Sequence, residues 1–157
     1  MNSDEHREGL AWLADILRCS TESLVSELIA GDASPRKFYR ITTADLQTHI
    51  LMLSPATENN ERFVLVQRLL ESKAIPVPGL PRADMRRGYF LLEDLGDITF
   101  WQALENTPKA VEVDSLYHGA LSVLASLQVI RSADHVLPRY DYTCLLYTSD
   151  AADEVDR

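Results

Sequence analysis

The chain opens with apolar residues at helical spacing. Over residues 4–18 they recur every three or four positions, which places them on one face of a helix. They are Leu10, Leu13, Ile16 and Leu17, with Trp12 at the edge of that face. Ser3 stands directly before them, where a side-chain oxygen can cap the first turn. We therefore predict a helix over 4–18 that packs through a single face.

Three short segments rich in β-branched, aromatic and aliphatic residues come next, and this composition is typical of strands. They span residues 24–29, 37–43 and 47–53. The first connection is long and contains Gly31 and Pro35, whereas residues 44–45 leave room only for a tight hairpin. The pattern predicts an antiparallel meander.

Helical spacing returns over residues 58–73, where Phe63, Val66, Leu69 and Leu70 are predicted to line one face. Residues 75–81 contain three prolines, so they cannot continue this helix and must form a connector or an edge strand. The apolar run 88–93 predicts a buried strand, and a polar turn over 94–97 follows it. Arg86 and Arg87 are expected at a solvated hairpin tip before that strand.

Two helices complete the pattern, a short one over 99–104 and a longer one over 113–129. Apolar residues follow one face of the longer helix at Val113, Leu116, Ala120, Leu121, Leu124 and Leu127. The order of elements is helix, three strands, helix, two strands, linker and helix. This order predicts an α+β fold with one antiparallel sheet of about five strands.

Composition narrows the class of protein. With 46% hydrophobic residues, a chain of 157 residues can build a core of about one domain. The 24 acidic against 15 basic residues, a net charge of −9, argue against a nucleic-acid surface. Two cysteines cannot form a disulfide framework, and neither an export signal nor a membrane-spanning run is evident. We expect a cytoplasmic protein with no nucleic-acid or membrane partner.

Four motifs follow one another in order: GDASPRKFYRI at 31–41, ILMLSP at 50–55, LLEDLGD at 91–97 and LPRYD at 137–141. In this order and spacing they resemble the aminoglycoside phosphotransferase superfamily, which has a protein-kinase-like fold. The nearest branch is the bacterial cell-wall-recycling kinases of N-acetylmuramate and N-acetylglucosamine. The resemblance implies a kinase-like amino-terminal lobe over 1–97, followed over 98–143 by linker helices and the start of a carboxy-terminal lobe.

The resemblance also implies a nucleotide site. In this fold the loop with Gly31, Ala33 and Ser34 lies over the phosphates, and Lys37 adds positive charge. A polar hairpin loop is the alternative interpretation of the same residues. The crossover between the lobes implies adenine recognition by backbone groups around Glu93, Asp94 and Leu95, where a buried strand ends in an exposed turn.

Two details of this site remain open in the sequence. Asp94 and Asp97 could bind a metal, but acidic residues in a turn usually cap the next helix, and we favour the cap. The third strand has no Lys for the phosphates, as the sugar-kinase branch commonly lacks it, which leaves Arg36, Lys37 and Arg40 as cations. Strand alternation separates Lys37 from Arg40, so only one basic residue is expected to face the nucleotide.

Phosphoryl transfer in this superfamily needs one Asp to orient the substrate hydroxyl and a second Asp to hold magnesium. The first Asp commonly stands in an H-x-D-x-x-x-x-N loop, which residues 113–143 do not contain, and the resemblance places both Asp residues in the carboxy-terminal lobe. We expect a parent protein that uses ATP, Mg²⁺ and an amino sugar, and a chain without catalytic or metal-binding residues of its own. A non-catalytic nucleotide- or partner-binding module, or an α+β interaction domain without nucleotide, remains the alternative.

The last residues differ from the rest in character. CLLYTSDAADE, at 144–154, resembles the in-frame translation of a sequencing-library adapter. We interpret 144–157 as a non-native tail that replaces the missing lobe, and Asp141, Tyr142 and Thr143 could still be native. A natural strand with an acidic terminus is the alternative. Without its partner lobe, the apolar face of the last helix is expected to be exposed.

Overall fold

The computed structural model describes residues 3–29, 35–106 and 109–130. Its helices and strands follow the predicted order, and the bounds of the predicted helices and of the four predicted strands differ from the prediction by at most three residues. They are α1 (Ser3–Leu17), β1 (Val25–Ile29), β2 (Lys37–Thr42), β3 (Thr48–Leu53), α2 (Asn60–Ser72), β4 (Arg82–Asp84), β5 (Tyr89–Glu93), α3 (Phe100–Glu105) and α4 (Ala110–Gln128). A single 3₁₀ turn, Thr21–Ser23, joins α1 to β1. The predicted α+β fold is confirmed.

The five strands form one antiparallel sheet in the order β1-β2-β3-β5-β4. Tyr39 of β2 lies opposite Leu51 of β3, which lies opposite Leu91 of β5. Because side chains directly opposite each other share a face, this register divides the sheet into two apolar faces. The proline-rich segment is a connector, and the edge strand is the short β4 that follows it.

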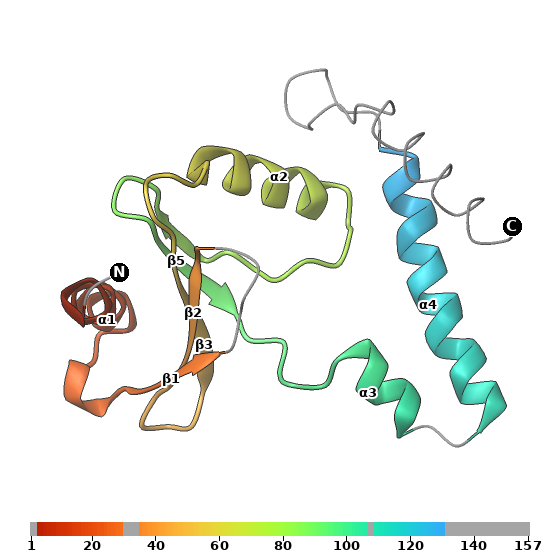
Figure 1. Ribbon diagram of the computed structural model, residues 1–157, viewed down its shortest axis with the longest axis horizontal. Helices are drawn as coiled ribbons and strands as arrows, with labels where there is room; N and C mark the ends of the chain where they lie inside the picture. The colour runs from red at the N-terminus through yellow and green to blue at the C-terminus, as the bar shows by residue number, and fades with distance from the viewer. Residues whose placement is uncertain (1–2, 30–34, 107–108, 131–157) are drawn as a thin grey trace, which may run out of the picture.

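Helix α1 covers one face of the sheet and α2 covers the other (Figure 1). The α1 side holds a buried cluster of Leu13, Ala14, Leu24, Ile41, Leu51, Leu53, Tyr89 and Leu91. The α2 side holds a second cluster of Ile50, Met52, Val64, Phe90 and Leu92. Burial of these side chains supplies the main driving force for folding of this part of the chain. The sheet is therefore the middle layer of three.

The buried side of α2 differs from the predicted one. Its most buried residues are Asn60, Val64 and Gln67, whereas Phe63 and Val66 are only half-buried. The helix also begins later than predicted, because the Asn59 side chain caps it by accepting a hydrogen bond of 2.9 Å from the Arg62 amide. Phe63 still packs edge-on against Phe90 of the sheet, with ring centroids 5.5 Å apart, and Phe63, Val66 and Leu70 of the predicted face also line a cavity described below.

The turn between β4 and β5 places Arg86 and Arg87 at an exposed tip, as predicted. Gly88 ends that turn with φ of 76°, a backbone conformation that favours glycine. Its carbonyl accepts a hydrogen bond of 2.8 Å from the Ser54 amide. A Cβ atom at Gly88 would lie 1.9 Å from the Ser54 carbonyl oxygen, so the close approach requires glycine.

Helices α3 and α4 follow the sheet and lie to one side of it (Figure 1). Thr99 begins α3 with a reciprocal capping box to Gln102. The prediction that Asp94 or Asp97 caps this helix is therefore wrong. Phe100 of α3 packs edge-on against Tyr117 of α4, with ring centroids 5.5 Å apart. Most apolar residues of α4 are exposed, as predicted.

None of the helices within the described ranges is both long enough and apolar enough to cross a bilayer. The LPRYD motif and the adapter-like residues 144–154 fall outside the described residues.

Candidate functional site

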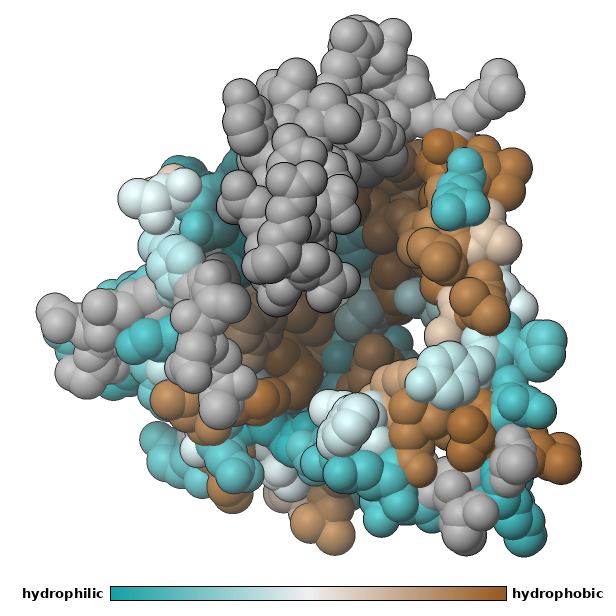
Figure 2. Space-filling view, turned by 45° about the vertical axis from the view of Figure 1, so that its right-hand side comes forward, coloured by the Kyte–Doolittle hydropathy of each residue, from teal (hydrophilic) through white to brown (hydrophobic). Residues whose placement is uncertain are grey.

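A cavity of about 630 Å³ lies between α2 and the face of the sheet that α2 covers. It is open to solvent, and apolar surface lines the recess at the centre of this side of the molecule (Figure 2). Its apolar walls are formed by Phe38, Phe63, Val66, Leu70, Val77, Pro78 and Leu92. A concave, mostly apolar site of this size is typical of small-molecule binding.

Polar groups gather at the end of the cavity next to the start of α2. Arg36 lies there, and its Nε donates a hydrogen bond of 3.1 Å to Ser54 Oγ. Its Nη2 lies 3.3 Å from Glu58 Oε2, and its guanidinium carbon lies 5.1 Å from the centre of the Phe63 ring. The Arg36 and Glu58 side chains are 20% and 26% exposed. Asn59 and Arg62 complete this polar end.

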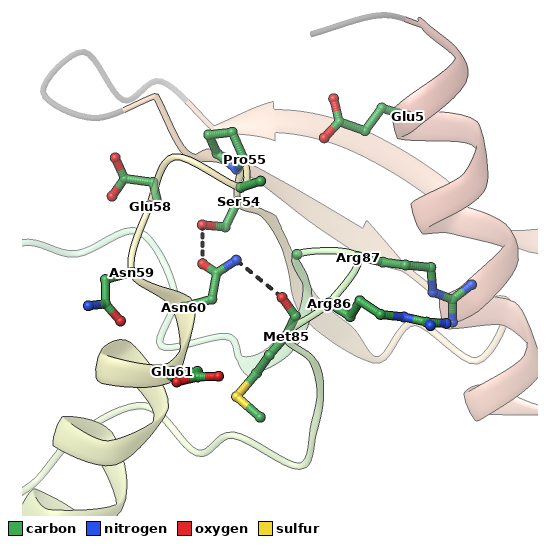
Figure 3. Close-up of a pocket in the computed structure, with 12 residues that line it drawn as sticks. Glu5, Ser54, Pro55, Glu58, Asn59, Asn60, Glu61, Met85, Arg86 and Arg87 are labelled. Atoms are coloured by element: carbon green, nitrogen blue, oxygen red, sulfur yellow. Dashed lines mark hydrogen bonds between the residues drawn. The ribbon is translucent and has the colours of Figure 1, made fainter.

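A buried polar chain supports Arg36 from behind. Ser54 Oγ donates a hydrogen bond of 2.6 Å to Asn60 Oδ1, and Asn60 Nδ2 donates one of 3.4 Å to the Met85 carbonyl (Figure 3). These contacts join β3, α2 and the β4–β5 turn. A second, polar pocket of about 470 Å³ adjoins them. Arg86 and Arg87 line it but extend away from the Ser54–Asn60 pair (Figure 3).

The predicted cation Lys37 lies on the α1 face of the sheet. It pairs with Leu53, which packs in the α1 cluster, and its neighbour Phe38 packs on the α2 side. The predicted alternation along β2 is confirmed. The positive charge of Lys37 also reaches α1: burial and then Lys37 together lower the pKa of His6. The role of Lys37 in nucleotide binding stays a prediction. Gly31, Ala33 and Ser34 lie outside the described residues.

The predicted crossover residues have different partners. The Glu93 amide donates a hydrogen bond of 2.9 Å to the Gly79 carbonyl, and the Glu93 carboxylate accepts one of 3.0 Å from the Gly79 amide. Leu95 is exposed, and its backbone groups make no hydrogen bond within the described part of the chain. Of these two residues, Leu95 is therefore the one whose backbone N–H and carbonyl groups can form hydrogen bonds with the edge of a ligand.

Asp94 binds Arg40 of β2 rather than a helix end. Arg40 Nε and Nη2 donate to the two Asp94 carboxylate oxygens at 2.7 and 3.0 Å, and Arg40 Nη1 donates to Asp97 Oδ1 at 2.5 Å. The hydrogen bond from Arg40 lowers the pKa of Asp94 to about 2, and the two carboxylates raise the pKa of Arg40. The Asp94 side chain is only 5% exposed. This ion pair fastens the segment after β5 to the sheet.

Sequence reasoning missed both the Arg40–Asp94 pair and the role of Arg36 as a cavity residue. Strand alternation gave a signal for the first, because Arg40 lies opposite Ile50 and Ile50 lies opposite Leu92, two residues before Asp94. Arg36 precedes the predicted strand, so alternation within that strand did not place it. Among the residues that the structure describes, no three His, Cys, Asp or Glu side chains are grouped to hold a metal ion.

Comparison with known proteins gives one consistent group of relatives. No family model and no solved structure matches the chain. Three curated relatives are each described as N-acetylmuramate/N-acetylglucosamine kinase. The Pseudomonas aeruginosa protein is 33% identical over 122 residues, which cover 76% of this chain and 35% of the relative. The Pseudomonas putida protein is 33% identical over 112 residues, covering 71% and 32%.

The third relative, from Neisseria meningitidis serogroup B, is 30% identical over 118 residues, covering 74% of this chain and 34% of that protein. The chain thus spans about a third of the length of the curated relatives it matches. The order of the sequence motifs and the five-stranded antiparallel sheet agree with this similarity. Over its matched residues the chain is a distant homologue of the N-acetylmuramate/N-acetylglucosamine kinases.

Proposed function

We propose that the cavity between α2 and the sheet holds ATP, and that the whole protein transfers its terminal phosphate to an amino sugar of the N-acetylglucosamine or N-acetylmuramate type. The observation that carries the proposal is the cavity itself, with apolar walls, one basic end and a lining that includes Leu92, directly before the crossover residues. Homology to kinases of these sugars supplies the reaction class. As a kinase of recycled wall sugars, the protein would act in the cytoplasm.

The two ends of the cavity suit the two parts of a nucleotide. Leu70, Val77 and Leu92 offer an apolar surface for a purine, and the unpaired backbone of Leu95 follows three residues after Leu92. The polar end with Arg36 and Arg62 suits the phosphates. Phosphoryl transfer depends on positioning and on stabilising charge, so orienting the nucleotide is the contribution proposed for this part of the protein.

Magnesium, which kinase chemistry implies, does not fit the described residues. They contain no cluster of three or more possible ligands, so we assign no step to the ion. The chain matches about a third of each relative. We therefore expect the 157-residue chain to bind ATP without transferring phosphate. Incubation with ATP and either N-acetylglucosamine or N-acetylmuramate should yield no sugar phosphate, and formation of a sugar phosphate would contradict this expectation.

Nucleotide binding can be tested by calorimetry and by thermal melting of the chain with and without ATP and magnesium. A ligand that binds only the folded state raises the melting temperature, and the rise grows with the logarithm of the ligand concentration relative to its dissociation constant. The cavity can be blocked by Val66→Trp, since Val66 lines it. Leu65→Trp is the matched control, because Leu65 is the next residue of α2 and is 52% exposed.

The proposal predicts that ATP raises the melting temperature of the wild type and of Leu65→Trp, and that Val66→Trp loses this rise while keeping its own unliganded transition. If all three proteins respond equally to ATP, the nucleotide binds elsewhere. If the wild type shows neither a thermal shift nor a heat of binding, the chain is not a nucleotide-binding unit.

A further inference from the structure

The three basic side chains in and directly before β2 have different surroundings. Arg40 is bound by Asp94 and Asp97 at 2.5 to 3.0 Å. Lys37 lies on the α1 face of the sheet, away from the cavity. Arg36 alone of these three lines the cavity between α2 and the sheet.

Arg36 is held in a fixed orientation. Ser54 accepts a hydrogen bond from its Nε, Glu58 faces its Nη2, and the Phe63 ring lies beneath its guanidinium carbon. Ser54 is itself fixed by Asn60, and both are buried. A guanidinium carries five N–H donors in a planar fork, so it can serve several acceptors at once and matches phosphate oxygens well. Little side-chain entropy remains to be lost when a ligand binds.

The cavity is also polarised along α2. Arg36, Glu58 and Arg62 lie near the start of the helix, whereas Leu70, Val77 and Leu92 lie toward its end. Two guanidinium groups and one carboxylate give the polar end a net positive charge. A ligand that combines an apolar ring with a polyanionic tail would match both ends at once.

We infer that Arg36 contacts the phosphates of the nucleotide in this cavity, in the absence of a lysine on β3. The inference rests on the proposed function, since it assigns one residue within that nucleotide site. It assigns to Arg36 the phosphate contact that the sequence suggested for Lys37. The Arg36 guanidinium is partly buried, and the Glu58 carboxylate beside it balances its charge.

The ratio of affinities for ATP and adenosine isolates this contact, because the two ligands share base and ribose and differ only in the phosphates. Calorimetry with the 157-residue chain would compare wild type, Arg36→Met, Arg36→Lys and Lys37→Met. Arg68→Met is the matched control, because Arg68 is exposed on α2 and does not line the cavity. The melting curve of each unliganded variant verifies that it is folded.

We expect Arg36→Met to lose about tenfold to hundredfold in ATP affinity, as for a charge-assisted contact, with adenosine affinity unchanged within about twofold. Arg36→Lys keeps the charge but not the fork, so it should lose less. If Arg36→Met does not fold, an unchanged ATP-to-adenosine ratio in Arg36→Lys overturns the inference, and a reduced ratio supports it. Arg68→Met should match the wild type.

An unchanged ratio in Arg36→Met, or a fallen ratio in Lys37→Met alone, overturns the inference while leaving the proposed function intact. Equal loss of ATP and adenosine in Arg36→Met would mean that Arg36 only supports the cavity wall, and it overturns the inference as well. If the wild type binds neither ligand, the proposed function and this inference both fail.

Discussion

The sheet with α1 and α2 differs sharply from the pair of helices that follows it. In the first region, side chains such as Leu51 and Phe90 are completely buried between layers. In the second, α3 and α4 contain no buried residue among those described, and Leu121 and Leu124 of α4 are 58% and 50% exposed. Apolar surface gathers along this side of the molecule (Figure 2). Both regions carry apolar residues at regular spacing.

The comparison shows that the spacing of apolar residues indicates which face of a helix or strand is apolar, but not what that face packs against. The strands and α1 bury their apolar residues against one another, and this burial stabilises the folded state. Among the described helices and strands, the main neighbour of α4 is α3, and no residue of α4 is buried. Stability should therefore reside in the sheet and its two helices, and substitutions should have graded effects that follow this division.

The largest effect is expected at Gly88, where the sheet leaves no room for a side chain. Gly88→Ala would place a Cβ 1.9 Å from the Ser54 carbonyl oxygen in a positive-φ conformation. We expect a loss of more than about 3 kcal/mol in the free energy of unfolding, measured by urea denaturation, because backbone must shift. Gly96→Ala has a similar φ of 81° with open space around it, so it should cost only about 1 kcal/mol.

Equal losses for the two glycines would show that backbone conformation, and not the close approach to Ser54, determines the cost.

A pair of leucines tests the two regions directly. Leu51→Ala removes a completely buried side chain and should lower the free energy of unfolding by about 3 kcal/mol, through lost burial and the cavity left behind. Leu124→Ala trims a half-exposed residue of α4 and should change it by no more than about 0.5 kcal/mol. A comparable loss at Leu124 in urea denaturation would mean that the face of α4 is covered in solution, and the contrast between the regions would disappear.

The junction between the two regions should be intermediate. Arg40→Met removes both ion pairs to the segment after β5 and leaves the buried Asp94 carboxylate without its guanidinium partner. The loss of melting temperature should be smaller than for Leu51→Ala and clearly larger than for Arg68→Met, an exposed arginine on α2. Differential scanning calorimetry would measure both variants. An Arg40→Met protein that melts like the control would show that the segment needs no such attachment.

The sequence predicts the sheet well because strands and α1 follow short-range periods. It fails where a polar residue finds its partner far along the chain. Asn60 and Gln67 take the buried positions of α2 because Met85 and Pro78 offer carbonyl groups to them at 3.4 and 3.3 Å. Helical spacing instead predicts that Phe63 and Val66 are buried, because it contains no information about carbonyl groups elsewhere in the chain. Asp94 was assigned to a helix cap by the same local logic, while its partner is 54 residues away.

The candidate site shows the same limit. The crossover segment could be located from the apolar run that ends at Glu93, because a buried strand followed by a polar turn is a local pattern. The choice among the cations at the start of β2 could not be made, since it depends on which face α1 covers and on where Glu58 and Asp94 lie. Arg36, Lys37 and Arg40 are equivalent as cations in the sequence, and only their tertiary contacts distinguish what each can bind.

The last predicted effect concerns pH and the same junction. In the folded chain the Asp94 pKa is lowered from 3.8 to about 2, chiefly by the hydrogen bond from Arg40. Between these two values the unfolded chain binds more protons than the folded one, so stability rises with pH in this window. The contribution of Asp94 is complete above about pH 4 and is lost as the pH falls toward about 2. We expect it to be roughly 2 kcal/mol.

Urea denaturation between about pH 5 and pH 2 would measure this contribution as a difference between proteins. Asp45 and Asp84 also have lowered pKa values and titrate in every variant, so their share cancels when wild type is compared with Asp94→Asn. The wild type should lose more stability than Asp94→Asn over this interval, and Arg40→Met should resemble Asp94→Asn because its Asp94 has no guanidinium partner. Parallel curves for all three proteins would show that the Arg40–Asp94 contact does not form in solution, and the two regions would then be joined by the chain alone.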